Sequence, residues 1–117
     1  MDSTLTLRWL GAAAVELTCG ERVLVLDPFV SRFPLWRLIA GRVRTDERLC
    51  AQTVPACHHV LISHAHFDHL LDAPAIARRT GAICLGSPNA CKLLLAHGVP
   101  PAQVQAIATG ARLLLGP

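Results

Sequence analysis

Tyrosine is absent from this 117-residue chain, and aromatic residues make up only 4% of it. Proteins that bind single-stranded nucleic acids stack bases on aromatic side chains beside a positively charged groove. The net charge is +3, but the arginines are scattered along the chain instead of forming one stripe. We therefore expect no nucleic-acid partner.

Long apolar runs and paired cysteines are also lacking. No stretch approaches the roughly 18 consecutive apolar residues of a membrane-spanning helix. The first residues do not show the basic-then-apolar order of a secretion signal, so we expect a cytoplasmic protein without a transmembrane segment. The five cysteines form an odd set without a C-x-x-C pair, which argues against a disulfide framework.

Individual cysteines allow two further interpretations. Cys84 and Cys91 lie among apolar residues, so we expect buried thiols there. Cys57-His58-His59 has metal-binding side chains, but no second ligand pair at zinc-finger spacing accompanies it. A structural role is the favoured interpretation of these three residues.

The composition is that of a folded domain. Hydrophobic residues account for 52% of the chain and charged residues for 16%. These proportions predict a packed core, and the length predicts that residues 1–117 form one small domain or a piece of a larger one. Strand patterns come first along the chain and helix–strand alternation follows, and the α/β (α+β) fold class expected here is the one implied by the family resemblance described below.

Apolar periodicity and turn residues predict the elements of this domain. Strands are expected over residues 4–10, 13–18, 22–26, 60–63, 82–85 and 104–107, and helices over 35–40, 75–80 and 87–97. Gly20 should form a hairpin turn, and the remainder of 31–55 shows no regular pattern. Asp72 is expected to cap a helix N-terminus. His97 lies near a helix C-terminus, which explains it without a metal.

Six residues, His64-Ala65-His66-Phe67-Asp68-His69, contain four potential metal ligands directly after an apolar strand. Side chains two apart in an extended segment point the same way, so His64 and His66 can approach one ion. Asp68 and His69 follow where the chain must turn. Imidazole and carboxylate suit zinc, and also iron or manganese. The alternative is a polar loop with a chance cluster of histidines.

Asp27 ends an earlier strand, where Pro28 prevents a further ladder hydrogen bond. A carboxylate at a strand end can orient a metal-bound histidine from behind. It can equally serve as a turn-forming aspartate.

Three stretches together resemble the metallo-β-lactamase fold hydrolase superfamily: Leu10-Gly11, Val23-Leu24-Val25-Leu26-Asp27-Pro28-Phe29, and Val60 to Leu70 with its S-H-x-H-x-D-H sequence. The resemblance implies an αββα sandwich of which this chain is the N-terminal half. It also implies that His64 and His66 bind one metal, that Asp68 and His69 bind a second, and that Asp27 supports the site.

The activity implied by the resemblance is hydrolysis of an ester, lactone, amide or phosphodiester. Two metal ions, most simply Zn²⁺, would share an activated hydroxide in a complete site. Asp68 would manage the proton as the intermediate breaks down. The substrate itself is not determined by these residues.

The second half of the chain lacks the further ligands that the family supplies. Downstream of the motif only His97 and Asp72 carry the right groups, and neither lies in a matching context. Three hypotheses follow: a hydrolase that is catalytic only with its missing half, a truncated non-catalytic fragment or interaction domain, and a metal-binding module completed by a partner chain. An uncovered sheet face would favour self-association.

Overall fold

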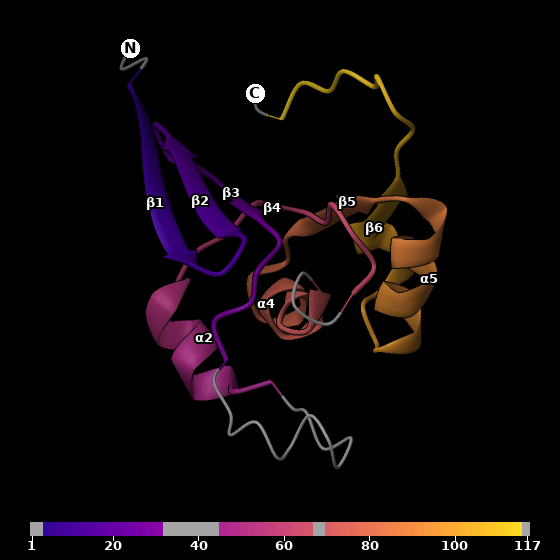
Figure 1. Cartoon of the computed structure of the whole chain (residues 1–117), viewed down its shortest axis with the longest axis horizontal. Helices are drawn as coiled ribbons and strands as arrows, with labels where there is room; N and C mark the ends of the chain where they lie inside the picture. Colours follow the sequence, from indigo (N-terminus) through magenta and orange to yellow (C-terminus); the bar gives the residue numbers. More distant parts are fainter. Residues whose placement is uncertain (1–3, 32–44, 67–69, 116–117) are drawn as a thin grey trace.

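A six-stranded sheet in the order β1-β2-β3-β4-β5-β6 forms the centre of the molecule (Figure 1). The computed structural model describes residues 4–31, 45–66 and 70–115. The strands are β1 (Leu5–Gly11), β2 (Ala14–Cys19), β3 (Arg22–Leu26), β4 (His59–Leu61), β5 (Ile83–Gly86) and β6 (Val104–Ala106). Every predicted strand is therefore confirmed, with shifted ends.

The first three strands are antiparallel and the last four are parallel. The predicted hairpin at Gly20 joins β2 to β3, and Cys19 pairs with Arg22 across it. Gly20 has a φ of 60°, a conformation that glycine adopts at little cost. Parallel neighbours need a crossover connection, and in this chain helices supply it.

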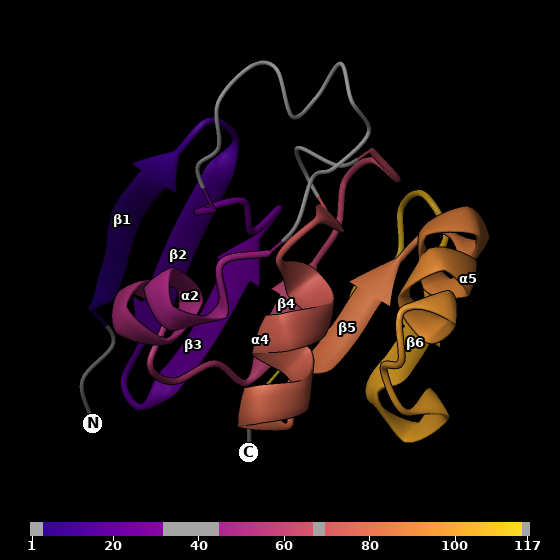
Figure 2. The same cartoon turned by 90° about the horizontal axis from the view of Figure 1, so that it is seen from below.

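Helices α2 (Glu47–Thr53), α4 (Ala73–Thr80) and α5 (Pro88–Ala96) all lie on one face of the sheet (Figure 2). A short 3-10 helix, η1 (Pro101–Gln103), precedes β6. The core fills the space between the sheet and the helices, where Val25, Val60, Ile76 and Leu94 are each 0% exposed. Cys84 and Cys91 are buried and unpaired, as the sequence predicts.

The ends of α4 and α5 follow the predicted signals. Gly81 caps α4 with a left-handed φ of 77°. The Ser87 side chain accepts a hydrogen bond from the amide of Ala90 at the start of α5. His97 is the C-cap of α5, which is the structural position expected for it.

Helix α2 is the element that sequence analysis misses. Asp46 is its N-cap and accepts a hydrogen bond from the amide of Leu49. At its other end, the guanidinium of Arg79 donates to the carbonyls of Cys50 and Val54. A seven-residue helix is marginal by itself, so this contact from α4 contributes what the local sequence lacks. The helix predicted over 35–40 lies outside the described residues.

The structure also changes the role predicted for Asp72, which was expected to cap the N-terminus of a helix. It occupies the N-cap position of α4, but its side chain makes no capping hydrogen bond. The carboxylate instead accepts hydrogen bonds from the amides of Val30 and Ser31 at 2.6 and 2.8 Å, and from the Ser31 hydroxyl at 2.7 Å. Asp72 is 0% exposed. It therefore holds the segment that follows β3 against the start of α4.

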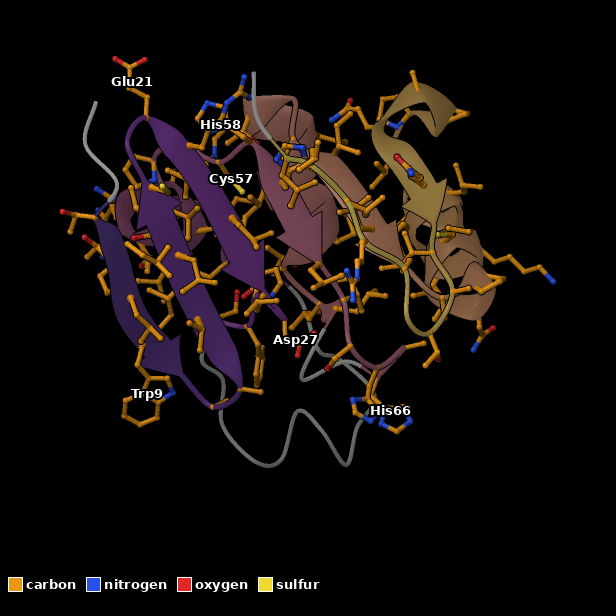
Figure 3. All side chains as sticks on the ribbon, turned by 90° about the horizontal axis from the view of Figure 1, so that it is seen from above. Trp9, Glu21, Asp27, Cys57, His58 and His66 are labelled. Atoms are coloured by element: carbon orange, nitrogen blue, oxygen red, sulfur yellow. The ribbon has the colours of Figure 1, made fainter. Side chains whose placement is uncertain are left out.

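The face of the sheet away from the helices is largely open over β1–β3. Alternate residues of β1, namely Leu5, Leu7 and Trp9, are 62%, 66% and 68% exposed. The segment after β6 crosses the same face over the later strands (Figure 3). Within the described ranges, the molecule thus has one helical layer and one sheet, an α/β pair of layers. No helix among these residues has the length and apolar character to cross a membrane.

Candidate metal centre

The carboxyl ends of β3 and β4 lie side by side and carry the polar residues of the candidate site. The amide of Asp27, one residue beyond β3, donates to the carbonyl of Leu61 at 2.9 Å and extends the parallel ladder. Ligands of open α/β sheets bind outside the carboxyl ends of the strands. Asp27 and His66 lie at this edge of the sheet (Figure 3).

His64 and His66 follow β4, and the structure brings their side chains together. Their ring centroids are 6.1 Å apart, with the ring planes tilted by 33°. Both residues are exposed, so a ligand can reach the rings from solvent. The pair has the donor chemistry of a divalent-metal site.

Asp27 lies behind the histidines, joined to them through Ser63. One carboxylate oxygen of Asp27 accepts from the Ser63 amide at 2.6 Å, and the other accepts from the Ser63 hydroxyl at 2.5 Å. The same hydroxyl oxygen lies 3.0 Å from Nδ1 of His64. Asp27 is 6% exposed, whereas Ser63 and His64 are exposed, so this chain of hydrogen bonds is buried at its Asp27 end and open to solvent at its His64 end.

The backbone at Asp27 is in an unusual conformation. Its φ is 47°, in the left-handed region that most residues avoid and aspartate tolerates better than most. Such conformations cost on the order of 1–3 kcal/mol and persist where the surroundings hold them. Here Asp72 fixes the segment just downstream through Val30 and Ser31. Asp27 thus lies at the turn after β3 with its carboxylate bonded to Ser63, and its role in supporting a metal site stays a prediction.

The remaining predicted ligands, Asp68 and His69, lie outside the described residues. Within those residues, no group of three or more His, Cys, Asp or Glu side chains is close enough to hold a metal ion. The described part of the site is therefore the pair of imidazoles with its buried carboxylate support. Sequence reasoning missed Ser63, whose only signal is a hydroxyl directly before the first histidine.

The alternative cluster, Cys57-His58-His59, lies at the opposite end of β4 (Figure 3). Burial raises the pKa of the Cys57 thiol to about 11, which keeps it protonated and a poor metal ligand at neutral pH. Nδ1 of His58 accepts a hydrogen bond from the Val23 amide at 3.0 Å. Burial, followed by the charges of Arg22 and His58, lowers the pKa of His59. These contacts support the structural interpretation.

Comparisons with known proteins agree with this architecture. The family model of the metallo-beta-lactamase superfamily matches residues 39–108. A UPF0173 metal-dependent hydrolase of Pyrobaculum islandicum is 31% identical over 112 residues, which are 96% of this chain and 45% of the relative. One from Symbiobacterium thermophilum is 36% identical over 100 residues, or 86% of this chain and 39% of the relative.

A solved structure shows the same fold. Igni18, described as a novel metallo hydrolase from the archaeon Ignicoccus hospitalis, superposes with a TM-score of 0.67 at 23% identity. The match covers 95% of this chain and 42% of Igni18. The chain thus spans less than half the length of these relatives. Because the family model matches more than half of the residues, the chain belongs to the metallo-beta-lactamase superfamily.

Proposed function

We propose that this chain contributes the first half of the metal centre of a metal-dependent hydrolase. The observation that carries the proposal is the pair of exposed imidazoles, 6.1 Å apart, at the carboxyl end of β4. His64 and His66 would bind one metal ion, and Asp68 and His69 would provide ligands for a second. Zinc fits imidazole and carboxylate donors best, and iron or manganese would also be accepted.

When bound, such an ion polarises a carbonyl or phosphoryl oxygen and makes water a stronger nucleophile at neutral pH. The chain's own residues orient the ligands and move protons. Asp27 and Ser63 hold the His64 side of the site, and Asp68 transfers a proton during breakdown of the intermediate. The substrate class that suits this chemistry is an ester, lactone, amide or phosphodiester.

Metal binding tests the proposal directly. We expect Zn²⁺ added to the purified chain to cause saturable changes in the NMR signals of the His64 and His66 rings. Binding should be weak, because each ion would have only two ligands from the motif, whereas catalytic zinc usually has three. Replacing both histidines by alanine should remove the response. His97→Ala, at the C-cap of α5, is the matched control and should bind like the wild type.

Two results would contradict the proposal. The wild type could show no response at millimolar Zn²⁺, or the double variant could respond like the wild type. Two tightly held zinc ions after purification would instead contradict the predicted weakness. Any hydrolysis by the metal-loaded protein should disappear in His66→Ala, and an unchanged rate would exclude a catalytic site at the motif.

The open face of β1–β3 favours one alternative, a non-catalytic interaction domain. Leu5, Leu7 and Trp9 occupy alternate positions of β1, so they lie on the same face of the sheet, and each is more than 60% exposed. Contiguous apolar surface of this kind marks interaction sites in many proteins. A chain that self-associates but shows no metal response would support this alternative over the hydrolase.

A further inference from the structure

The hydrogen bonds around Ser63 determine which nitrogen of His64 faces outward. We propose that Ser63 is a positioning residue that holds His64 in the Nδ1–H tautomer, so that Nε2 is the atom offered to a metal ion. The consequence for metal binding rests on the proposed function. The tautomer itself does not, because it follows from contacts within the chain.

The argument begins with the donors and acceptors of a serine hydroxyl. The group has one proton to donate and two lone pairs with which to accept. Its oxygen lies 2.5 Å from a carboxylate oxygen of Asp27 and 3.0 Å from Nδ1 of His64. A carboxylate only accepts, so the hydroxyl proton must point to Asp27. The hydroxyl oxygen then accepts, and Nδ1 of His64 must carry the proton.

The anchor of this chain of bonds is fixed by the fold. Asp27 is held at its amide by the carbonyl of Leu61 and is 6% exposed. Its second carboxylate oxygen accepts from the Ser63 amide at 2.6 Å, so both ends of Ser63 are tied to one side chain. The hydroxyl has little freedom to turn its proton toward His64. A neutral histidine in water exchanges between two tautomers, whereas here one is selected.

His58 provides a contrast within the same molecule. Its Nδ1 lies 3.0 Å from the amide nitrogen of Val23, which can only donate. Nδ1 of neutral His58 is therefore the acceptor, and its proton is on Nε2. The structure thus assigns opposite tautomers to His58 and His64. One spectrum can test both assignments.

For the metal site, a fixed tautomer means that no free energy is spent on selecting one of the two tautomers when the metal ion binds. Histidines that bind metals commonly donate their other ring N–H to a carboxylate, carbonyl or water, and removal of that partner typically weakens metal binding by about 10–100-fold. In this chain the hydroxyl of Ser63 lies between the ring and the carboxylate. Sequence inspection identifies Asp27 as the supporting residue but does not reveal that it acts through Ser63.

The experiment is a two-bond ¹H–¹⁵N NMR correlation of the histidine rings in the metal-free chain, recorded at about pH 8.5, where imidazole is generally neutral. We expect the Nδ1–H pattern for His64 and the Nε2–H pattern for His58. In Ser63→Ala, the His64 pattern should become that of a mixture of both tautomers, and the His58 pattern should be unchanged. Ser63→Thr keeps the hydroxyl and should restore the wild-type pattern.

A second measurement follows the consequence for Zn²⁺. Its affinity should fall about 10–100-fold in Ser63→Ala and return toward the wild-type value in Ser63→Thr. An Nε2–H pattern for His64 in the wild type, or an identical pattern in Ser63→Ala, would overturn the inference even if the chain binds zinc. The predicted tautomer without any zinc response would support the positioning role and contradict the proposed function.

Discussion

At the scale of single residues, buried polar groups determine where the candidate site lies. Asp72 looks like an ordinary helix N-cap in the sequence, yet its carboxylate accepts hydrogen bonds from Val30 and Ser31 instead. The Ser31 hydroxyl in turn accepts from the amide of Asp46, which begins α2. Asp72 therefore connects the segment after Asp27 to two helices. Because these hydrogen bonds engage both carboxylate oxygens, Asp72 is unsuited to bind a metal ion.

Asp72→Ala is expected to destabilise the protein by about 3 kcal/mol or more. Its removal leaves three donors without their acceptor, and each unsatisfied buried donor costs about 1–3 kcal/mol. Asp72→Asn keeps one acceptor oxygen and the same shape, so a smaller loss is expected. Urea unfolding at pH 7 measures both changes. If the free energy of unfolding of the alanine variant falls by less than about 1 kcal/mol, water or a rearrangement must satisfy these donors, and the prediction is wrong.

At the scale of elements, small and medium side chains, including cysteine thiols, fill the buried interface between the sheet and the helices. Cys84 on β5 is 0% exposed, and burial raises the pKa of its thiol to about 12. Burial similarly raises the pKa of Cys50 on α2 to about 12. Such thiols are inert at neutral pH. Because these thiols stay protonated while they are buried, the stability of the packed elements depends on pH in the alkaline range.

We expect the free energy of unfolding to fall as pH rises from about 9 toward 12. The unfolded thiol ionises near 9.0 and the folded Cys84 thiol near 12, so the unfolded state alone loses protons in this window. Each such thiol contributes a slope of about 1.4 kcal/mol per pH unit. Cys84→Ala should make the decline shallower, whereas Cys19→Ala, at an exposed position, should not. Urea unfolding under reducing conditions measures the slopes, and parallel slopes for Cys84→Ala and wild type would contradict this prediction.

At the scale of the whole molecule, one face of the sheet is packed and the other is partly open. Helices cover the face that carries Val25 and Val60, and the segment after β6 crosses only part of the other face. The open part, on β1–β3, presents a row of large apolar side chains to water. Burial of such surface is worth about 25 cal/mol per Å² of apolar area, which favours association.

We therefore expect the chain to self-associate in a concentration-dependent way. Leu7→Lys places a charge in the open apolar face and should shift the protein toward the monomer. Thr6→Lys adds the same charge to the same strand but on the alternate face, so it is the matched control. Sedimentation velocity across a range of concentrations measures the effect. A wild type that remains monomeric at high concentration, or equal effects of the two substitutions, would contradict the prediction.

Much of this organisation could be predicted from local sequence. Alternating apolar residues predicted β1, because a half-buried strand must alternate, and apolar stretches bounded by turn residues predicted β2 and β3. Gly20 and Gly81 marked a hairpin turn and a helix end, because few other residues adopt a positive φ easily. The six-residue motif named His64 and His66 as metal ligands from residue type and spacing, and that assignment stays a prediction. The superfamily itself was evident from the order of these stretches.

Other features depended on residues far apart in sequence. Sequence analysis missed helix α2 because its C-terminal carbonyl groups accept hydrogen bonds from a residue of another helix, Arg79 of α4. Asp72 occupies the predicted N-cap position but makes no capping hydrogen bond, because the partners of its side chain lie 41 and 42 positions away. The link from Asp27 to Ser63 spans 36 positions. No local pattern records such pairings, because they exist only once the strands align.

The sequence alone therefore determined the superfamily, the six strands, helices α4 and α5 and the identity of the motif histidines, since these follow from periodicity and residue chemistry. Tertiary structure decided that Asp27 reaches His64 through a serine hydroxyl. It also decided that Asp72 is a buried anchor and that a row of apolar residues on β1 faces water. The physical reason is that hydrogen-bond partners and burial depend on which strand ends and helices meet, and only the packed sheet brings them together.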